Sequence, residues 1–332
     1  MRLALACNRS HLYQPAEGQP EDQFEEFDAP ETVDAIAQTI ASFGHTVETL
    51  EADHTFPEHL KAGRYDLVFN ISEGFKGRCR ESLVPAVCEM LHVPYTGSDP
   101  LTMAISLDKN MAKKVLTGLI PLPAGRVFCS ARDLDRPGAL DGLAFPALIK
   151  PNAEGSSKGI RTFSRVDSMQ KAREVILWAL NEYKGPALIE EFLPGVECTV
   201  GVVGNETPRV IGIMEIAPKK VAQEHFVYSL ETKRDYKNQV EYRIPPQLPE
   251  STRKAIEEVA LGAFRGLDCR DFCRVDVRLG ADGMPRFIEV NPLPGLSPVK
   301  SDLVILARGM SIEYPDLMKM ILDAAFKRLG LS

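Results

Sequence analysis

The residues best suited to chemistry lie in a short segment near the middle of the chain. An apolar run ends at Lys150 and is followed by a loop rich in glycine and serine, residues 151–159. Glycines let a backbone approach a ligand closely, and successive backbone N–H groups bind anionic oxygens. The Walker A pattern GxxxxGK[ST] is absent here, and we expect strands on both sides. We therefore expect a different phosphate-binding loop, the alternative being an ordinary hairpin turn beside an exposed lysine.

A second segment carries carboxylates around a short apolar link. Glu190 and Glu191 end one expected strand, and Leu193 and a Pro-Gly turn lead to Glu197. One carboxylate can accept from an adenine amino group, the main chain near Leu193 can bond to the ring edge, and Glu197 can accept ribose hydroxyls. By itself the segment would fit a solvated acidic hairpin equally well.

A third segment pairs two polar strand ends. Residues two apart on a strand share a face, so Arg274 lies beside Asp276, and Glu289 beside Asn291. Oxygen ligands of this kind suit Mg²⁺ held jointly by nucleotide phosphates. Arg274 could neutralise a transferred phosphate or a tetrahedral oxyanion. The alternative is a ladder of surface salt bridges.

The elements that must position these residues predict an α/β protein. In residues 1–100 we expect alternating strands and helices, which indicates a parallel sheet covered by helices. The strands are expected at 3–7, 46–50 and 66–71, and the helices at 32–42 and 82–91. A polar, acidic stretch at 8–30 interrupts this order, and so long a loop is either mobile or functional.

Two further units are expected, giving three domains at 1–100, 101–185 and 186–332. In the second we expect helices at 107–116 and 167–183 and strands at 125–128, 146–149 and 160–163. In the third we expect strands at 187–191, 197–203, 274–279 and 286–289 and helices at 251–264 and 314–328, with an Asp282-Gly283 turn joining the last two strands.

Taken together, the three segments resemble the ATP-grasp superfamily, and within it the D-alanine–D-alanine ligase family. The resemblance extends over nearly the whole chain from about residue 66, and it includes VPYTGS at 93–98 and LDK at 107–109. It implies an N-terminal parallel α/β domain and two α+β domains that clamp ATP. It also implies an enzyme that activates a carboxylate as an acyl phosphate, joins it to an amine, and releases ADP and phosphate.

The resemblance also assigns roles to residues. Lys109 and Lys150 would contact the phosphates and the adenine side of ATP, and Ser156 and Ser157 would lie in the mobile loop. The other implied roles are adenosine binding by Glu190, Leu193 and Glu197, a γ-phosphate contact by Lys233, two Mg²⁺ ions (or Mn²⁺) on Asp276, Glu289 and Asn291, and catalysis by Arg274, Lys233 and Ser156.

The substrate side departs from the family pattern. The family's N-terminal GGxSxExxVS stretch is missing, and Glu26 or Asp28 lies at about the right distance to replace its glutamate. Its HGxxGEDG loop is replaced by residues 70–81, and further expected substrate contacts are Arg80, Arg234, Lys300 and Ser301. Arg78 adds a further positive charge to this set. If these basic side chains face the substrate, they favour a larger or more anionic partner than D-alanine. The alternative is that they point to solvent and only balance the charge of the acidic loop.

Composition narrows the class of protein. A net charge of −7 argues against nucleic-acid binding and against an anionic membrane surface. No apolar run is long enough to cross a bilayer, so we expect a cytoplasmic protein, and from the resemblance a homodimer. The seven cysteines show no CxxC pair, and we expect buried free thiols.

Two other functions stay open from the sequence. The same chemistry could act on another acid and amine, as in ligases that attach an amino acid to a mycosporine. Alternatively, the chain could be a nucleotide-binding regulatory module without turnover. The complete set of Asp276, Glu289 and Asn291 argues against such a module, because it has no need of metal ligands.

Overall fold

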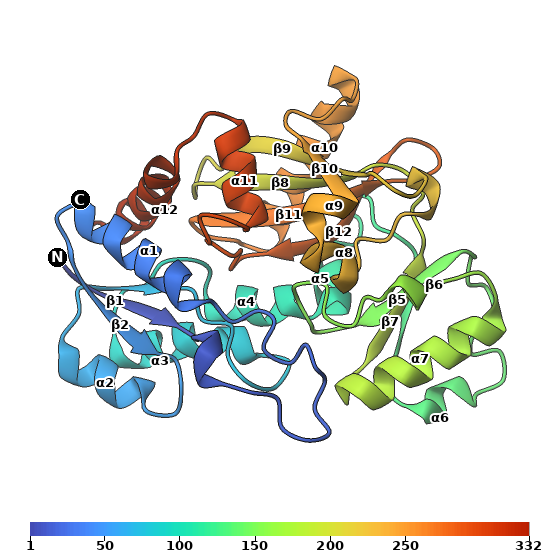
Figure 1. Ribbon diagram of the computed structural model, residues 1–332, viewed down its shortest axis with the longest axis horizontal. Coiled ribbons are helices and arrows are strands. Elements are labelled where there is room, and N and C mark those ends of the chain that lie inside the picture. Colours follow the sequence, from blue (N-terminus) through green and yellow to red (C-terminus); the bar gives the residue numbers. More distant parts are fainter. Residues whose placement is uncertain (332) are drawn as a thin grey trace.

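Three separate β-sheets organise residues 1–331, the part of the chain that the computed structural model describes (Figure 1). The first sheet is parallel, with strand order β2-β1-β3, as its alternating pattern predicts. Its strands are β1 (Arg2–Cys7), β2 (Thr46–Glu51) and β3 (Leu67–Asn70).

The two faces of β1 bury different neighbours. Leu3 and Leu5 point into the core that includes α1 (Pro30–Ser42), whereas Ala4 and Ala6 point toward α2 (Phe56–Gly63) and α3 (Leu83–Leu91). This alternation is the side-chain period of a strand covered on both faces.

The second sheet is antiparallel, with strand order β4-β7-β5-β6. It consists of β4 (Gly125–Phe128), β7 (Ala187–Glu191), β5 (Ala147–Pro151) and the short β6 (Arg165–Val166). One face packs on α7 (Met169–Tyr183), and α6 (Ala131–Leu134) adds Leu134 to the same core. Because β7 belongs to this sheet, our proposed boundary between the second and third domains moves from residue 185 to just after Glu191.

The third sheet is also antiparallel, with strand order β10-β9-β8-β11-β12. Its strands are β8 (Glu197–Val203), β9 (Arg209–Pro218), β10 (Val240–Arg243), β11 (Phe272–Leu279) and β12 (Pro285–Asn291). One face packs on α10 (Glu250–Gly266) and the other on α11 (Asp302–Gly309) and α12 (Tyr314–Leu329).

The N-terminal and C-terminal parts share one hydrophobic core. Ile36 and Ile40 of α1 lie in the same buried cluster as Leu317 and Ile321 of α12. In Figure 1, α1 and α12 lie side by side near the two termini. The first sheet is therefore anchored to the C-terminal helices as well as to its own.

Several elements differ from the sequence-based expectation. The strand expected at 160–163 is wrong: a 3-10 helix (Thr162–Ser164) precedes β6. The helix expected at 107–116 is interrupted, because Asp108 ends α4 (Pro100–Leu107) and caps α5 (Lys109–Leu116) by accepting from the Met111 N–H. Elements that the sequence did not predict are α2, α4, α6, β6, β9, β10, α11, α8 (Leu230–Arg234) and α9 (Tyr236–Gln239), with 3-10 turns at Ser10–Leu12, Arg80–Ser82 and Gln223–His225.

All seven cysteines are free thiols, but Cys79 and Cys129 are exposed, so the expectation of burial holds for the other five. Among residues 1–331, no helix combines the length and apolar character needed to span a membrane.

Candidate active site

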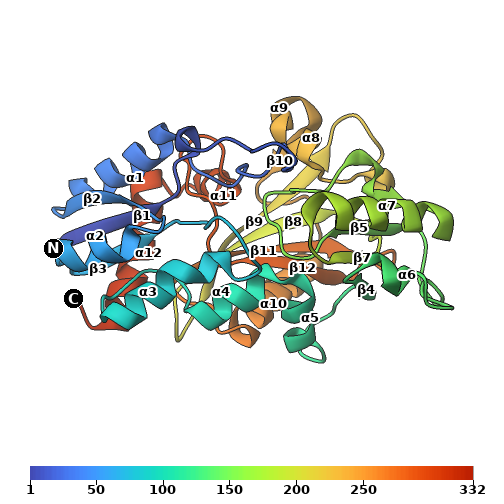
Figure 2. The same cartoon turned by 90° about the horizontal axis from the view of Figure 1, so that it is seen from below.

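A cavity lies between the second and third sheets, and all three chemistry-bearing segments of the sequence line it. Figure 2 shows β5 and β7 beside the edge formed by β11 and β12. From β5 come Lys150 and the loop that follows it, and from the third sheet come Glu197, Asp276 and Glu289. The predicted residues that line this cavity are Lys150, Ser156, Ser157, Glu197, Lys233, Arg274, Asp276 and Glu289.

Lys150 stands in a buried cluster of paired charge. Its Nζ lies 2.8 Å from one oxygen of Glu190, and Lys113 contacts the other oxygen. Burial lowers the pKa of Lys150 to about 8 and that of Lys113 well below its usual value. Glu190 itself does not line the cavity. Its contact with nucleotide stays a prediction, and in this structure its side chain holds the two lysines.

The adenosine residues are placed unequally. Glu197 lines the cavity and accepts a hydrogen bond from the Arg278 guanidinium at 2.9 Å. Leu193 is buried and is not among the residues that line the cavity. Arg278 also lies over the ring of Phe192, 4.7 Å from its centroid. Arg278 thus holds Glu197 in place. The sequence analysis did not single out Arg278, because the only indication was its position on the expected strand, two residues after Asp276.

The glycine- and serine-rich loop turns sharply at two serines. Ser156 and Ser157 have φ of 50° and 59°, in the left-handed region of the backbone. The Ser157 hydroxyl donates to the Tyr228 carbonyl at 3.1 Å, just before α8. This contact links the loop to the helix that carries Lys233.

The acidic N-terminal segment, residues 8–29, lies against this loop. Glu26 accepts from the Gly155 N–H at 2.8 Å, and Asp22 accepts from the Gly159 N–H at 3.2 Å. Asp22 also accepts from the Tyr183 hydroxyl at 2.7 Å. The segment therefore covers the phosphate loop through specific hydrogen bonds. Of the two expectations for this long stretch, mobile or functional, these contacts favour a functional role.

The predicted metal ligands converge at the β11–β12 edge. Asp276 and Glu289 are direct partners in the strand register, and Asn291 Nδ2 lies 3.3 Å from Asp276. Arg274 donates to Asp276 at 2.8 Å, and Lys109 Nζ lies 3.1 Å from Glu289. Burial raises the pKa of Asp276; for Glu289 burial acts the same way, but Lys109 and Lys150 hold its pKa at about 2.

A neighbouring cavity collects most of the predicted substrate residues. It is lined by Glu26, Asp28, Arg234, Lys300 and Ser301, together with Lys233 and Arg274. Burial raises the pKa of Asp28 to about 7, and Lys300 opposes that shift. Arg80 lies outside this cavity and is buried beneath Glu26.

The cations expected to favour an anionic partner are mostly neutralised. Arg80 lies 2.9 Å from Glu26, Arg234 lies 2.7 Å from Glu25, and Arg78 lies 2.5 Å from Asp108. The basic side chains therefore balance acids, most of them in the N-terminal segment. The expectation of a more anionic substrate loses its basis.

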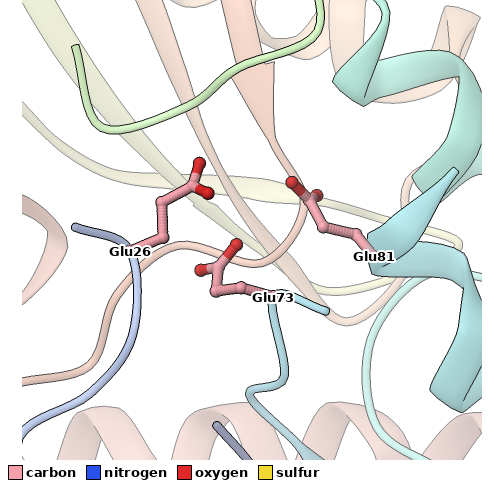
Figure 3. Close-up of side chains that lie close together, drawn as sticks. All are labelled: Glu26, Glu73 and Glu81. Atoms are coloured by element: carbon pink, nitrogen blue, oxygen red, sulfur yellow. The ribbon is translucent and has the colours of Figure 1, made fainter. Parts of the chain in front are cut away.

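The strongest feature that the sequence reasoning missed is a group of carboxylates. Glu26, Glu73 and Glu81 bring one oxygen each within 4.8 Å of one another, and Figure 3 shows their carboxyl groups pointing into the same space. Lys109, Arg274, Glu289 and Asn291 line the same cavity. Glu73 and Glu81 belong to the loop that replaces the family's HGxxGEDG stretch, which was the available signal.

Comparison with known proteins identifies the family. The family described as D-ala D-ala ligase C-terminus matches residues 136–323. The chain is 32% identical to the D-alanine–D-alanine ligase of Aquifex aeolicus over 87% of this chain and 92% of the relative, and 29% identical to the uncharacterized protein y4sG of Sinorhizobium fredii over 99% and 98%.

Solved structures share the fold. The D-alanine–D-alanine ligase of Bacillus anthracis complexed with ATP superimposes with a TM-score of 0.75 over 99% of both chains, at 22% identity. The VanG D-Ala:D-Ser ligase of Enterococcus faecalis gives 0.73 over 98% of this chain and 99% of that one, at 18% identity. The α/β fold of the ATP-grasp type that the resemblance implies is thus confirmed, and the chain belongs to the D-alanine–D-alanine ligase family of ATP-grasp ligases.

Proposed function

We propose that this protein joins the carboxylate of one small molecule to the amine of another, using ATP and releasing ADP and phosphate. The observation that carries the proposal is one cavity lined by Lys150 of β5, the loop after it and Lys233 of α8, opposite the acids of β11 and β12. The relative from Aquifex aeolicus named above is a D-alanine–D-alanine ligase, which supports the same reaction.

Different residues of the chain have different roles in the proposed reaction. Lys150, the N–H groups around Ser156 and Ser157, and Lys233 bind and orient the triphosphate. Arg274 lies within 4.0 Å of Glu289 and donates to Asp276, so its guanidinium can neutralise charge that develops on the transferred phosphoryl group. Holding both partners in register supplies much of the rate. The covering segment, through Glu26 and Asp22, keeps the loop closed and excludes water.

The β11–β12 edge fits magnesium. Asp276 and Glu289 offer carboxylates and Asn291 an amide oxygen on directly paired strands, which is the donor set that Mg²⁺ takes alongside nucleotide phosphates. Arg274 and Lys109 form ion pairs with these acids, which supports a site for positive charge. When bound, Mg²⁺ (or Mn²⁺) would neutralise phosphate charge as the γ-phosphoryl group leaves.

Amino acids are the proposed substrates, and D-alanine is the first to test. The curated relatives include D-alanine–D-alanine ligases, and no cationic surplus remains in the cleft to require an anionic partner. A mycosporine-type acid is less favoured for the same reason. A regulatory module without turnover is disfavoured by membership in a ligase family. Cytoplasmic location and a homodimer belong to the same proposal.

The test is a paired screen. Purified protein with Mg²⁺-ATP is offered D-alanine, other amino acids of both chiralities, and small acids combined with amino acids. We expect phosphate and ADP in proportion to a product whose mass equals the sum of two substrates less one water. AMP and pyrophosphate, or no release with any pair, would overturn the proposal.

A further inference from the structure

Three carboxylates surround Arg274, and they face different ends of its guanidinium group. Nε and Nη2 donate to Asp276 at 3.1 and 2.8 Å, and Nη2 also lies 4.0 Å from Glu289. The third carboxylate is that of Asp302, whose Oδ2 lies 3.7 Å from Nη1. Within residues 1–331, Nη1 donates no hydrogen bond, so this end of Arg274 is free to donate to a phosphoryl oxygen.

Asp302 differs from the other two acids because it is not a predicted metal ligand. Asp276 and Glu289 are the carboxylates that we propose for Mg²⁺, and an oxygen shared with a metal ion holds a guanidinium less strongly. Among the described residues, Asp302 is the only other acid within 4.0 Å of Arg274. Its side chain is buried, so water screens this contact little.

Asp302 is itself held by a short series of hydroxyl groups. Its Oδ1 accepts from the Tyr242 hydroxyl at 3.3 Å, and the Tyr242 and Tyr228 hydroxyls lie 2.9 Å apart. A phenol has one proton and an ionised carboxylate can only accept, so Tyr242 donates to Asp302 and Tyr228 donates to Tyr242. We call these three residues the tyrosine–aspartate chain.

The tyrosine–aspartate chain joins three elements around the site. Tyr228 precedes α8, Tyr242 belongs to β10, and Asp302 is the first residue of α11. The Tyr242 ring stacks on Tyr236 with 5.9 Å between centroids, and both pack on a small buried cluster. At the other end, the Tyr228 carbonyl accepts from the Ser157 hydroxyl of the phosphate loop. Packing therefore fixes the tyrosines that hold Asp302.

The groups of this arrangement keep the protonation states that it needs. Burial and the charge of Asp302 raise the pKa of Tyr228 and Tyr242, so both hydroxyls retain the protons that they donate. Burial disfavours the charge of Arg274, but Asp276 and Asp302 hold its pKa above the usual value. Arg274 therefore stays cationic although its side chain is largely buried.

We propose that Asp302 is a positioning residue for phosphoryl transfer, which orients the Nη1 end of Arg274 while Tyr242 and Tyr228 hold Asp302 in place. Tyr228, Arg274 and Asp302 line both the nucleotide cavity and the neighbouring substrate cavity, so the chain lies where the two meet. The simpler alternative is that Asp302 only stabilises the N-terminal turn of α11. The inference rests on the proposed function, so its tests include one that needs no turnover.

The first test is a double-mutant cycle on turnover. Asp302→Asn keeps the side-chain volume and can still accept from Tyr242, but it lacks the charge that faces Arg274. We expect kcat to fall about 10- to 100-fold with the KM for ATP within about twofold, because a displaced Arg274 impairs the transferred group and not the binding of ATP. In an Arg274→Lys background the same change should alter kcat less than about twofold, because Asp302 acts through Arg274.

Three further variants sharpen this test. Asp302→Glu restores the carboxylate and should recover part of the lost kcat. Tyr242→Phe removes one hydroxyl and should lower kcat about three- to tenfold, because Asp302 loses a hydrogen-bond donor. Asp316→Asn is the matched control: it also removes a carboxylate from the first turn of a helix, at an exposed position of α12, and should leave kcat unchanged.

The second test measures binding. Full-length protein with Mg²⁺ is titrated calorimetrically with ADP, with and without aluminium fluoride, a mimic of the transferred phosphoryl group. In wild type, aluminium fluoride should tighten ADP binding. In Asp302→Asn the dissociation constant of this complex should rise about tenfold, while that of ADP alone stays within about twofold. The Arg274→Lys background should again remove the effect of Asp302→Asn.

The outcomes decide the two claims separately. A weaker aluminium fluoride complex in Asp302→Asn, with no phosphate release by wild type, would keep the positioning role and overturn the ligase function. An unchanged kcat in Asp302→Asn, or no gain in ADP affinity from aluminium fluoride in wild type, would overturn the positioning role. Equal losses from Asp302→Asn in the wild-type and Arg274→Lys backgrounds would overturn it too, because Asp302 would then act independently of Arg274. A lowered melting temperature with normal kcat would leave only the role at the end of α11.

Discussion

Two clusters of buried charge lie on either side of the phosphoryl-transfer residues, and they are built in opposite ways. On the nucleotide side, Lys113 and Lys150 both contact Glu190, so every charged group has a partner inside the protein. In the carboxylate group of Glu26, Glu73 and Glu81, Glu73 has no partner in the described chain and Glu81 has only a distant one.

This contrast separates two kinds of site. A cluster that satisfies itself holds its side chains in one arrangement before any ligand arrives, which suits a nucleotide site common to a family. A cluster with unbalanced charge costs folding free energy until a ligand of opposite charge binds. Such a cost is typical of positions that determine which substrate is accepted.

The largest expected effect lies between the two clusters. Asp276→Asn should lower turnover at least a thousandfold, because an amide there binds Mg²⁺ weakly and leaves Arg274 without its carboxylate partner. Phosphate release measures this effect. The melting temperature should change little, because the pKa of Asp276 is raised in the folded protein, so its charge is not stabilising there, and because Arg274 keeps two other acidic neighbours, Asp302 at 3.7 Å and Glu289 at 4.0 Å. A sharp fall in melting temperature with activity retained would show that Asp276 is structural.

The next effect tests the self-satisfied cluster. Glu190→Gln leaves two buried lysines without a carboxylate and should destabilise the protein by roughly 3–5 kcal/mol. Thermal melts at pH 7 measure it. Burial lowers the pKa of both lysines, that of Lys150 to about 8, so the loss should shrink at pH 9, where Lys150 releases its proton. Glu191→Gln, whose partly exposed side chain lies 3.6 Å from Arg286, is the adjacent control and should cost little.

A smaller effect concerns the cover of the phosphate loop. Asp22→Asn should weaken the contacts to Gly159 and Tyr183 and speed proteolytic cleavage within residues 151–159 several-fold in the absence of nucleotide. Mg²⁺-ATP should slow that cleavage in wild type, because phosphate contacts order the loop. Glu17→Gln, at an exposed position of the same segment, serves as control. Equal fragments and rates with and without nucleotide would contradict the idea.

Strand residues of the candidate site were easier to predict from the sequence than loop residues, and the reason is physical. Lys150 and Asp276 end regular strands, where side-chain alternation fixes direction from the sequence alone. Glu73 lies in irregular backbone, and its meeting with Glu26 depends on a fold that joins segments 47 residues apart. Lys113 could have been found, since it follows Lys109 by one helical turn. The prediction of a strand at 160–163 was wrong because this stretch forms a 3-10 helix that leads into β6.

The smallest expected effect is a gain in stability, opposite to the loss expected for Glu190→Gln. Glu73→Gln removes an unpaired charge, and glutamine keeps the volume, so the variant should be more stable than wild type at pH 8. Burial and the charges of Glu26 and Glu81 raise the pKa of Glu73 in the folded protein, and Arg80 only partly opposes them. A raised carboxyl pKa means that the folded state binds its proton more tightly than the unfolded state does.

This difference in proton binding determines how the stability difference between Glu73→Gln and wild type changes with pH. In the unfolded chain a glutamate titrates near pH ~4.3, so as the pH rises above that value wild type loses stability until Glu73 ionises in the folded protein. At pH 4 the carboxyl group is mostly neutral in both states, and Glu73→Gln should melt with wild type. At pH 8 it should melt about 2–5 °C higher. Glu58→Gln should show neither shift, because its side chain is exposed. A variant that melts lower at pH 8 without ligand would show that Glu73 has a partner within the protein, and the contrast between the two clusters would fail.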